Sequence, residues 1–272
     1  MKRLDTTRPD WAPPDVDIET PSIARVYDYW IGGTHNFAVD RELGDRVRTG
    51  NPGLVASLRA NRAFLRRAVR ELSALGIRQF LDIGSGIPAE GNVHDVALSA
   101  HSDSTVVYVD IDPVAVAHGR ALLADEPRAA VFQGDLHQPR KILEADETRR
   151  LIDFDRPVAL ILAAVLHFVP DSEHPLELVR HFTAPLVPGS ALVLSHAGAE
   201  TVPRRAPEAA EQYRGAVSEV IWRDTAELTA LFADFDLLSP GVVRAPVWRP
   251  ELGEQADPDL AMLAGVGLKP GT

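Results

Sequence analysis

The sequence predicts an α/β protein with a mostly parallel β-sheet, one antiparallel strand at the sheet edge, and a helical extension at the N-terminus. Three observations lead to this prediction. From residue 79 onward, short apolar runs alternate with helical patterns, which is typical of a parallel sheet covered by helices on both faces. The segment Val158–Val165 is almost wholly apolar, as expected of a strand buried on both sides. A glycine turn, Gly84-Ser85-Gly86, joins the first apolar run to the helical pattern that follows it.

Composition limits the classes of function. The chain has 272 residues, enough for one large α/β domain with an appendage, and its net charge is −11. This acidic balance argues against a nucleic-acid or membrane partner. The chain has no cysteine, the first residues do not resemble a signal peptide, and no apolar run is long enough to span a bilayer. We therefore expect a cytoplasmic protein, and we expect no metal site because the histidines and acids do not follow metal-ligand spacing.

The N-terminal part divides into an arm and a helical region. Residues 1–20 contain three prolines and many acids, which predicts a flexible arm. Residues 21–76 predict three helices, beginning at Pro21, Val39 and Pro52. The third has a leucine-rich stripe and a set of arginines, which we interpret as a solvated face, with an anion site as the less favoured alternative. These arginines are Arg59, Arg62, Arg66, Arg67 and Arg70.

Residues 77–272 predict the main domain, with strands alternating with helices. The expected strands are Gln79–Ile83, Thr105–Asp110, Ala129–Gln133, Val158–Val165 and Ala191–Ser195. The expected helices are Asn92–Ala100, Pro113–Ala124, Pro139–Arg150, His174–Ala184, Pro203–Val220 and Thr225–Phe235. Two further strands are expected around the Pro240-Gly241 turn, over residues 235–243 and 245–250, and they would supply the antiparallel edge strand.

Open α/β sheets bind ligands at the carboxyl ends of their strands, so the residues there are the candidate site. They are Asp82 and the turn Gly84, Ser85 and Gly86 after the first strand, Asp110 and Ile111 after the second, Asp135 and Leu136 after the third, and Ala163 to His167 after the fourth. We interpret Asp112, directly before Pro113, as the cap of the next helix.

Two cofactor classes fit this arrangement. Gly84 to Ala89 nominally matches the dinucleotide pattern, and Asp110 could bind ribose hydroxyls in either class. Asp82 lies two residues before the first glycine, where its charge would disfavour a pyrophosphate but favour the ammonium group of a methionine-like moiety. Pro88 also delays the helix, whereas a dinucleotide site needs the helix N-terminus at the phosphates. Asp135 offers a contact suited to an adenine amino group. The set favours S-adenosylmethionine over a nicotinamide cofactor, and it resembles the class I S-adenosylmethionine-dependent methyltransferases.

The resemblance extends to one bacterial family, common in actinobacteria and formerly catalogued as a domain of unknown function. The motifs that carry it are residues 21–37 (PSIARVYDYWIGGTHNF), 80–88 (FLDIGSGIP), 91–95 (GNVHD), 108–113 (YVDIDP), and 240–243 with 248–250 (PGVV and WRP). It implies a Rossmann-like methyltransferase fold and S-adenosylmethionine binding, without implying an acceptor. Pro88 stands where methyltransferases in general often have a third glycine, and the tail from Met262 to Lys269 departs from the usual tyrosine- and glycine-rich ending.

The resemblance gives the N-terminal helices a role. We expect residues 21–76 to form a lid over the cofactor cleft, with Arg25, Tyr27, Gly33 and Asn36 near the methionine end of the cofactor. Packing against the sheet edge is the alternative. His167 is placed where a general base could lie, although the pattern slightly favours a histidine that only satisfies its loop.

The functional hypothesis is therefore an S-adenosylmethionine-dependent methyltransferase with a small-molecule acceptor. The alternative is an S-adenosylmethionine-binding sensor or partner module without transfer activity, which is motivated by the lack of a convincing base. A nicotinamide oxidoreductase on the same sheet is the least favoured.

Overall fold

The computed structural model describes residues 8–14, 16–51, 53–88, 91–199, 220–251, 257 and 260–271. Over these residues the strands form one sheet in the order β3-β2-β1-β4-β5-β8-β6, and β7 also pairs with β8. The first five strands are mutually parallel, and β8 runs antiparallel to β5, β6 and β7. The predicted fold class is confirmed: a mostly parallel sheet with antiparallel pairing toward one edge.

The strands are β1 (Gln79–Ile83), β2 (Thr105–Asp110), β3 (Ala129–Gln133), β4 (Val158–Ala163), β5 (Ala191–Ala197), β6 (Asp236–Leu237), β7 (Val243–Arg244) and β8 (Met262–Leu268). The helices are α1 (Ile23–Ile31), α2 (Ala38–Gly50), α3 (Leu54–Ala74), α4 (Val93–Ala100), α5 (Pro113–Leu122), α6 (Pro139–Glu144), α7 (Asp146–Leu151), α8 (Pro175–Thr183) and α10 (Thr225–Ala230).

Two local predictions need correction, and a third cannot be compared with the described residues. The antiparallel strand is β8, whereas the segment expected to supply it, residues 235–250, forms only the two-residue strands β6 and β7 and a 3₁₀ turn at Ala245–Val247. The helix expected at Pro139–Arg150 is divided at Ala145, whose φ of −60° and ψ of 148° are extended, into α6 and α7. The helix expected at Pro203–Val220 lies outside the described residues, apart from Val220 at its end.

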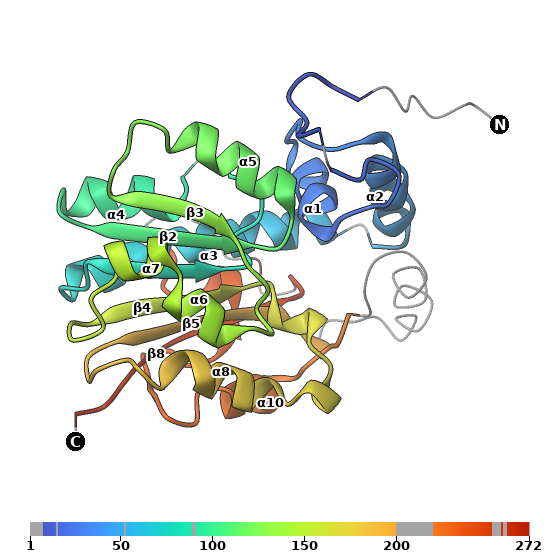
Figure 1. The fold of residues 1–272 in the computed structure, drawn as a ribbon. Coiled ribbons are helices and arrows are strands. Elements are labelled where there is room, and N and C mark those ends of the chain that lie inside the picture. Colours follow the sequence, from blue (N-terminus) through green and yellow to red (C-terminus); the bar gives the residue numbers. More distant parts are fainter. Residues whose placement is uncertain are drawn as a thin grey trace.

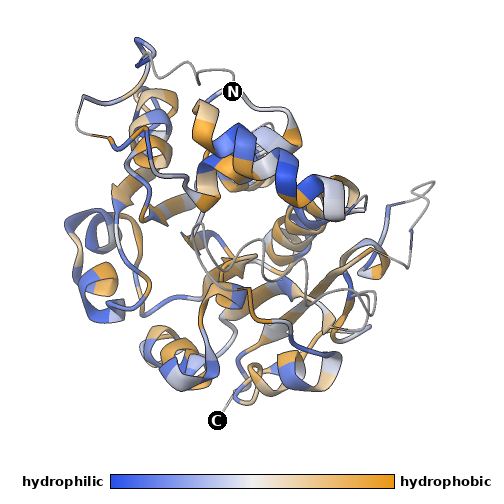
Figure 2. Ribbon diagram, turned by 90° about the vertical axis from the view of Figure 1, so that its right-hand side faces the viewer, coloured by the Kyte–Doolittle hydropathy of each residue, from blue (hydrophilic) through white to orange (hydrophobic). Residues whose placement is uncertain are grey.

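The sheet has a different helical layer on each face. Alternate residues of a strand point to opposite faces, so Leu81 and Ile83 pack on the side of α6, α7, α8 and α10, whereas Phe80 packs on the side of α3, α4 and α5. Figure 2 shows the strands coloured as hydrophobic and the surrounding helices as mixed, which is the pattern of a buried sheet between amphipathic helices. Asp82 shares the face of Phe80, and so it points toward α3.

The N-terminal helices divide between two environments. α3 packs on the sheet through Phe64, Leu65 and Val69, whereas α1 and α2 pack on each other around Val26 and Leu43. Figure 1 shows α1 and α2 to one side of the sheet, beyond the arrowheads of the parallel strands. Part of the predicted arm is packed against this region, because the buried side chains of Ala12 and Val16 join Phe37, Ile87 and Val114 in a small apolar cluster.

Candidate functional site

A cavity of about 440 Å³ lies between the carboxyl ends of the parallel strands and helix α1. Its volume is within the range of about 300–1,000 Å³ that is common for small-molecule sites. The parallel register brings the strand ends together here, since Ile83 is level with Val109 and Asp110 is level with Gln133. Ten predicted site residues line this cavity: Tyr27, Asp82, Gly84, Ser85, Gly86, Asp110, Ile111, Asp135, Leu136 and Ala163.

The glycine turn after β1 brings the backbone close to this cavity. Gly84 and Gly86 have φ angles of +73° and +69°, which glycine adopts without strain. A Cβ atom on Gly84 would lie 2.6 Å from Cγ2 of Val165, so a larger residue would collide with the β4 loop. A Cβ on Gly86 would meet no heavy atom within 4 Å, which means that this position faces open space.

Two buried carboxylates form the acidic part of the cavity. Asp110 accepts hydrogen bonds from the backbone N–H of Gly86 (2.7 Å) and of Asp112 (2.9 Å). Burial, together with the nearby Asp110 and against the opposing influence of Arg62, raises the pKa of Asp82 to about 7. Burial also raises the pKa of Asp110 to about 6. These carboxylates therefore need a ligand that supplies positive charge or hydrogen-bond donors.

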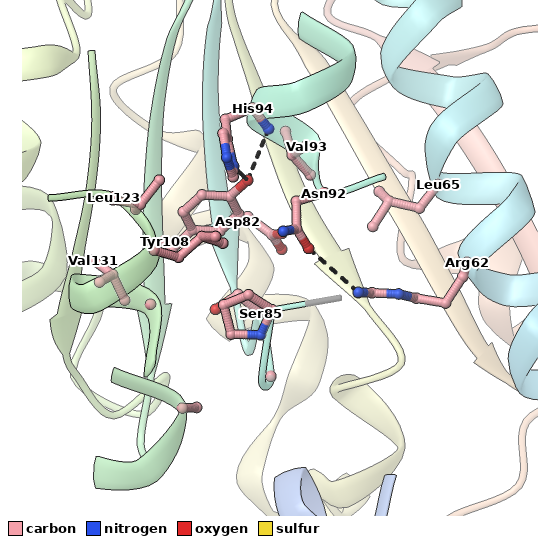
Figure 3. Close-up of a pocket in the computed structure, with 15 residues that line it drawn as sticks. Arg62, Leu65, Asp82, Ser85, Asn92, Val93, His94, Tyr108, Leu123 and Val131 are labelled. Atoms are coloured by element: carbon pink, nitrogen blue, oxygen red, sulfur yellow. Dashed lines mark hydrogen bonds between the residues drawn. The ribbon is translucent and has the colours of Figure 1, made fainter. Parts of the chain in front are cut away.

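Polar and aromatic side chains surround Asp82 behind the glycine turn. Figure 3 shows Asp82 between Tyr108 and the Asn92–Arg62 pair, in which Arg62 donates to Oδ1 of Asn92 over 3.4 Å. The hydroxyl of Tyr108 accepts from the backbone N–H of His94 at 2.8 Å, and burial raises its pKa well above the usual value. Tyr108 is therefore neutral and forms a fixed wall beneath Asp82.

Asp135 lines the cavity at the end of β3. Its carboxylate accepts from the backbone N–H of His137 (2.9 Å) and lies 2.8 Å from Nδ1 of the same residue. Nε2 of His137 is 2.7 Å from Glu173. This pairing fixes the Asp135 side chain at the end of β3, beside Leu136.

The other four predicted residues do not line this cavity. Arg25 is buried and binds Asp40 (3.0 Å) and the α5 cap Asp112 (3.8 Å), so it joins α1, α2 and the sheet. Asn36 donates to Oδ2 of Asp28 at 2.8 Å. Gly33 lies so close to Asp28 that a Cβ would be 1.9 Å from Oδ1. Gly33 and Asn36 thus position Asp28, and it is Asp28 that lines the cavity.

His167, the fourth, lies in a second, smaller cavity of about 80 Å³ beside the first. It belongs to a 3₁₀ turn, Leu166–Phe168, that follows β4. Burial and the nearby His196 and Arg223 lower its pKa well below the usual value, so the imidazole is neutral at pH 7. A neutral imidazole could accept a proton from a bound hydroxyl, as predicted for this position, although it is a weak base.

Several lining residues were not predicted, and they come from helices α1 and α3 and from the loop after β3: Ser22, Asp28, Asn61, Arg62 and His137. The interpretation of the α3 arginines as a solvated face is therefore wrong in part. Arg62 lines the cavity, and Arg67 is buried and donates to the carbonyls of Trp248 (3.0 Å) and Ala245 (2.7 Å). Asn61 is 3% exposed, and its Oδ1 has no hydrogen-bond partner within the described part of the chain.

Comparison with known proteins decides which ligand this geometry serves. A family model described as S-adenosyl methyltransferase matches residues 9–270. This chain belongs to the S-adenosyl methyltransferase family. The motifs from the N-terminal helix to the Trp248 segment thus carry the family resemblance that the sequence suggested.

Two crystal structures are similar over nearly the whole chain. One, of a proposed methyltransferase from Thermobifida fusca YX, is 40% identical, with a TM-score of 0.91 over 97% of this chain and 100% of that one. The other, of a DUF574 family protein from Streptomyces avermitilis MA-4680, is 39% identical, with a TM-score of 0.88 over 93% of this chain and 99% of that one. An O-methyltransferase family protein from Burkholderia thailandensis shares the fold at 16% identity, with a TM-score of 0.52 over 86% of this chain and 60% of that one. No match was found among curated proteins.

The cofactor of this S-adenosyl methyltransferase is S-adenosylmethionine, and the cavity fits it. This ligand combines a cationic methionine end with ribose and adenine groups that donate hydrogen bonds. The cavity offers acceptors for such groups in the buried carboxylates of Asp82 and Asp110 and in the unpartnered Oδ1 of Asn61. In the described part of the chain, no helix is long and apolar enough to cross a membrane, and no group of three or more histidines, cysteines or acids could hold a metal ion.

Proposed function

We propose that this methyltransferase transfers the methyl group of S-adenosylmethionine to a small-molecule acceptor held between α1 and the strand ends. One observation carries the proposal. The smaller cavity adjoins the cofactor cavity, and Ile23, Tyr27, Ala164 and Phe168 line both. The space beside the cofactor is therefore enclosed by side chains of α1 and of the β4 loop, which suits a small molecule.

The residues that line the cofactor cavity can be assigned to the three parts of S-adenosylmethionine. Asp110, at the end of β2, is the candidate for the ribose hydroxyls, and Asp135 with Leu136 is the candidate for the adenine. Asp82, Gly84, Ser85, Gly86 and Ala163 would surround the methionine end, with Tyr27 and Asp28 approaching from α1. Arg25, Gly33 and Asn36 act on this site indirectly, because they hold α1 and Asp28 in place.

Alignment is the main contribution that the protein makes to such a reaction. S-adenosylmethionine supplies an electrophilic methyl group, and an acceptor atom must approach it in line. Tyr27 limits the motion of an acceptor between the two cavities, since its hydroxyl donates to the carbonyl of Leu58 at 3.2 Å. His167 is the candidate to hold the proton of an acceptor hydroxyl.

A nucleic-acid acceptor fits the molecule poorly. The net charge of −11 repels phosphates, and five aspartates line the cofactor cavity: Asp28, Asp82, Asp110, Asp112 and Asp135. Among the described residues that line this cavity, the one lysine or arginine is Arg62.

Calorimetric titration tests the cofactor half of the proposal. Wild-type protein should bind S-adenosylmethionine and S-adenosylhomocysteine but not NAD. Asp110→Asn should weaken binding of both sulfur nucleotides, while the exposed Asp125→Asn should leave it unchanged. A second assay, release of S-adenosylhomocysteine with a panel of small hydroxylated and amino compounds, tests the acceptor half. Turnover with RNA or a protein, and with none of the small compounds, would contradict the proposal.

A further inference from the structure

The smaller cavity carries information about the acceptor itself. Its walls are mainly apolar and aromatic, and they come from α1, α2, α3, the β4 loop and β8. In the parts of the chain that the structure describes, no aspartate, glutamate, lysine or arginine lines it. A charged group would therefore be buried there without a counter-charge, at a high cost in free energy. The described lining therefore disfavours charged molecules at the inner end of the pocket.

Two polar atoms interrupt this apolar wall. Nδ1 of His167 and Nε1 of Trp222 are both buried, and neither has a hydrogen-bond partner among the described residues. His167 as a whole is 8% exposed. Buried polar groups are normally paired, so two unpaired ones in one pocket indicate a missing ligand. The indole N–H can only donate, whereas a neutral imidazole nitrogen can accept.

The position of His167 is fixed by its neighbours. The buried guanidinium of Arg223 donates to the carbonyls of Leu166 (3.1 Å) and Val169 (2.9 Å), on either side of His167. The backbone N–H of Ile221 donates to the carbonyl of His167 at 2.8 Å. The turn that carries the imidazole is therefore held at several points, and the side chain is pre-organised for a ligand rather than free to find another partner.

A second histidine supports the neutral state of the first. His196 lies with its ring centroid 5.5 Å from that of His167. Arg223 donates to Nε2 of His196 at 2.8 Å, so Nδ1 of His196 carries the proton and donates to the carbonyl of Ala197 at 2.9 Å. Burial lowers the pKa of His196 to about 4. The pocket therefore has one neutral imidazole in its wall, with a second neutral imidazole and the guanidinium of Arg223 behind it, which disfavours any further positive charge.

We propose that the smaller cavity is the acceptor pocket and that it takes a neutral aromatic compound with a hydroxyl group, whose oxygen accepts from Trp222 and whose proton is offered to His167. This inference rests on the proposed methyltransferase function and names its acceptor class. A hydroxyl group can accept and donate at once, which neither a hydrocarbon nor a carboxylate can do. The aromatic side chains of Tyr27, Trp30, Phe168 and Trp222 line the same pocket and suit a ring.

The test is a calorimetric titration of the full chain saturated with S-adenosylhomocysteine. The probes are p-cresol, toluene and 4-methylbenzoate, which share one ring and differ in the polar group. We expect p-cresol to bind about fivefold to tenfold more tightly than toluene, the difference that one or two hydrogen bonds make. We expect no measurable binding of 4-methylbenzoate. Equal binding of p-cresol and toluene, or tighter binding of the benzoate, would overturn the inference.

Two variants assign the effect to the named atoms. His167→Phe and Trp222→Phe should each reduce the preference for p-cresol over toluene while leaving the affinity for S-adenosylhomocysteine unchanged. His181→Phe makes the same change as the first on the exposed face of α8 and should preserve the preference. If the wild type did not bind S-adenosylhomocysteine at all, the proposed cofactor site would be wrong. That outcome is distinct from a failure of the acceptor inference, in which S-adenosylhomocysteine binds but p-cresol is not preferred. Retention of the full preference in both variants would also overturn the inference.

Discussion

Arg25 and Asp40 form a buried ion pair, with 3.0 Å between Nε and Oδ2, and the two side chains are 3% and 0% exposed. The same guanidinium donates to the carbonyls of Asp17 (3.1 Å) and Thr20 (2.5 Å). It also lies 3.8 Å from Asp112, the cap of α5. One side chain thus joins α1, α2, residues 17–20 and the sheet. These contacts hold α1, which lines the cavity, in a fixed position.

Replacement of this arginine tests its role. Arg25→Met should lower the free energy of unfolding by about 3–5 kcal/mol, because it leaves Asp40 buried without a counter-charge. Urea denaturation measures the change. The Arg25→Met substitution should also weaken S-adenosylmethionine binding, because it loosens α1, which lines the cavity. Arg46→Met removes an exposed pair with Glu42 and should change the stability by less than about 0.5 kcal/mol. Equal effects of the two variants would show that the pair does not hold α1.

Gly33 offers a second test of the N-terminal region. Gly33→Ala places a methyl group against the Asp28 carboxylate, which is held by the backbone N–H of His35 (2.9 Å) and by Asn36. We expect a loss of about 1–3 kcal/mol in thermal unfolding and weaker S-adenosylmethionine binding in calorimetry. Gly53→Ala is the control, because a Cβ there meets nothing within 4 Å. Unchanged binding in Gly33→Ala would mean that Asp28 is not needed for the cofactor.

The central part of the cavity could be predicted from the sequence because its rules are local. A parallel strand followed by a glycine turn fixes where Asp82 and Gly86 lie, and the strand-end rule places Asp110 beside them. Arg62 and Asp28 could not be found in this way. A helical pattern shows that a helix has two faces, but not that one end of a polar face meets a cleft formed by strands that follow later in the chain.

The same limit explains the missed strand β8. Gly265 and Gly267 give the segment a low strand propensity, so the local pattern is weak. The tertiary structure uses these glycines, because Phe232 packs closely against both: a Cβ would lie 3.2 Å from its ring at Gly265 and 3.0 Å from it at Gly267. The partner of the segment, β5, lies about 70 residues away in the sequence, and such a distant contact leaves no trace in a local pattern.

The buried arginine of α3 gives a prediction that sequence alone would not make. Arg67→Met should lower the free energy of unfolding by about 2–4 kcal/mol, because it leaves the carbonyls of Trp248 and Ala245 without their donor. Arg70→Met, one turn away, removes an exposed pair with Glu251 and should cost less than about 1 kcal/mol. Chemical denaturation compares them. Similar losses would show that the arginines of α3 are equivalent, as the sequence first suggested.

The raised pKa values of the cavity carboxylates predict an effect of pH on stability. The folded-state pKa of Asp82 is about 7, against a usual value of 3.8, so the folded protein binds this proton more tightly than the unfolded chain. The ligand-free protein should therefore lose stability as the pH rises from about 4 to 7. Asp82→Asn should be more stable than the wild type at pH 8 and similar to it at pH 4, as measured by urea denaturation. A variant that is less stable at pH 8 would contradict the raised pKa.

Cofactor binding should depend on pH in the opposite direction. A cationic ligand with several hydrogen-bond donors prefers ionised carboxylates, so binding must displace the protons that Asp82 and Asp110 hold at low pH. The affinity for S-adenosylmethionine should rise between pH 5 and pH 8, around the pKa values of about 6 and 7. Calorimetry in buffers of different ionisation enthalpy would detect the released protons. Asp82→Asn should bind more weakly at pH 8 and show a shallower pH dependence, whereas the exposed Asp125→Asn should keep the full slope. An affinity that is flat across this range would mean that the two carboxylates do not face the charged groups of the cofactor. The same buried carboxylates that destabilise the ligand-free protein at neutral pH are thus expected to strengthen its binding of the cofactor there.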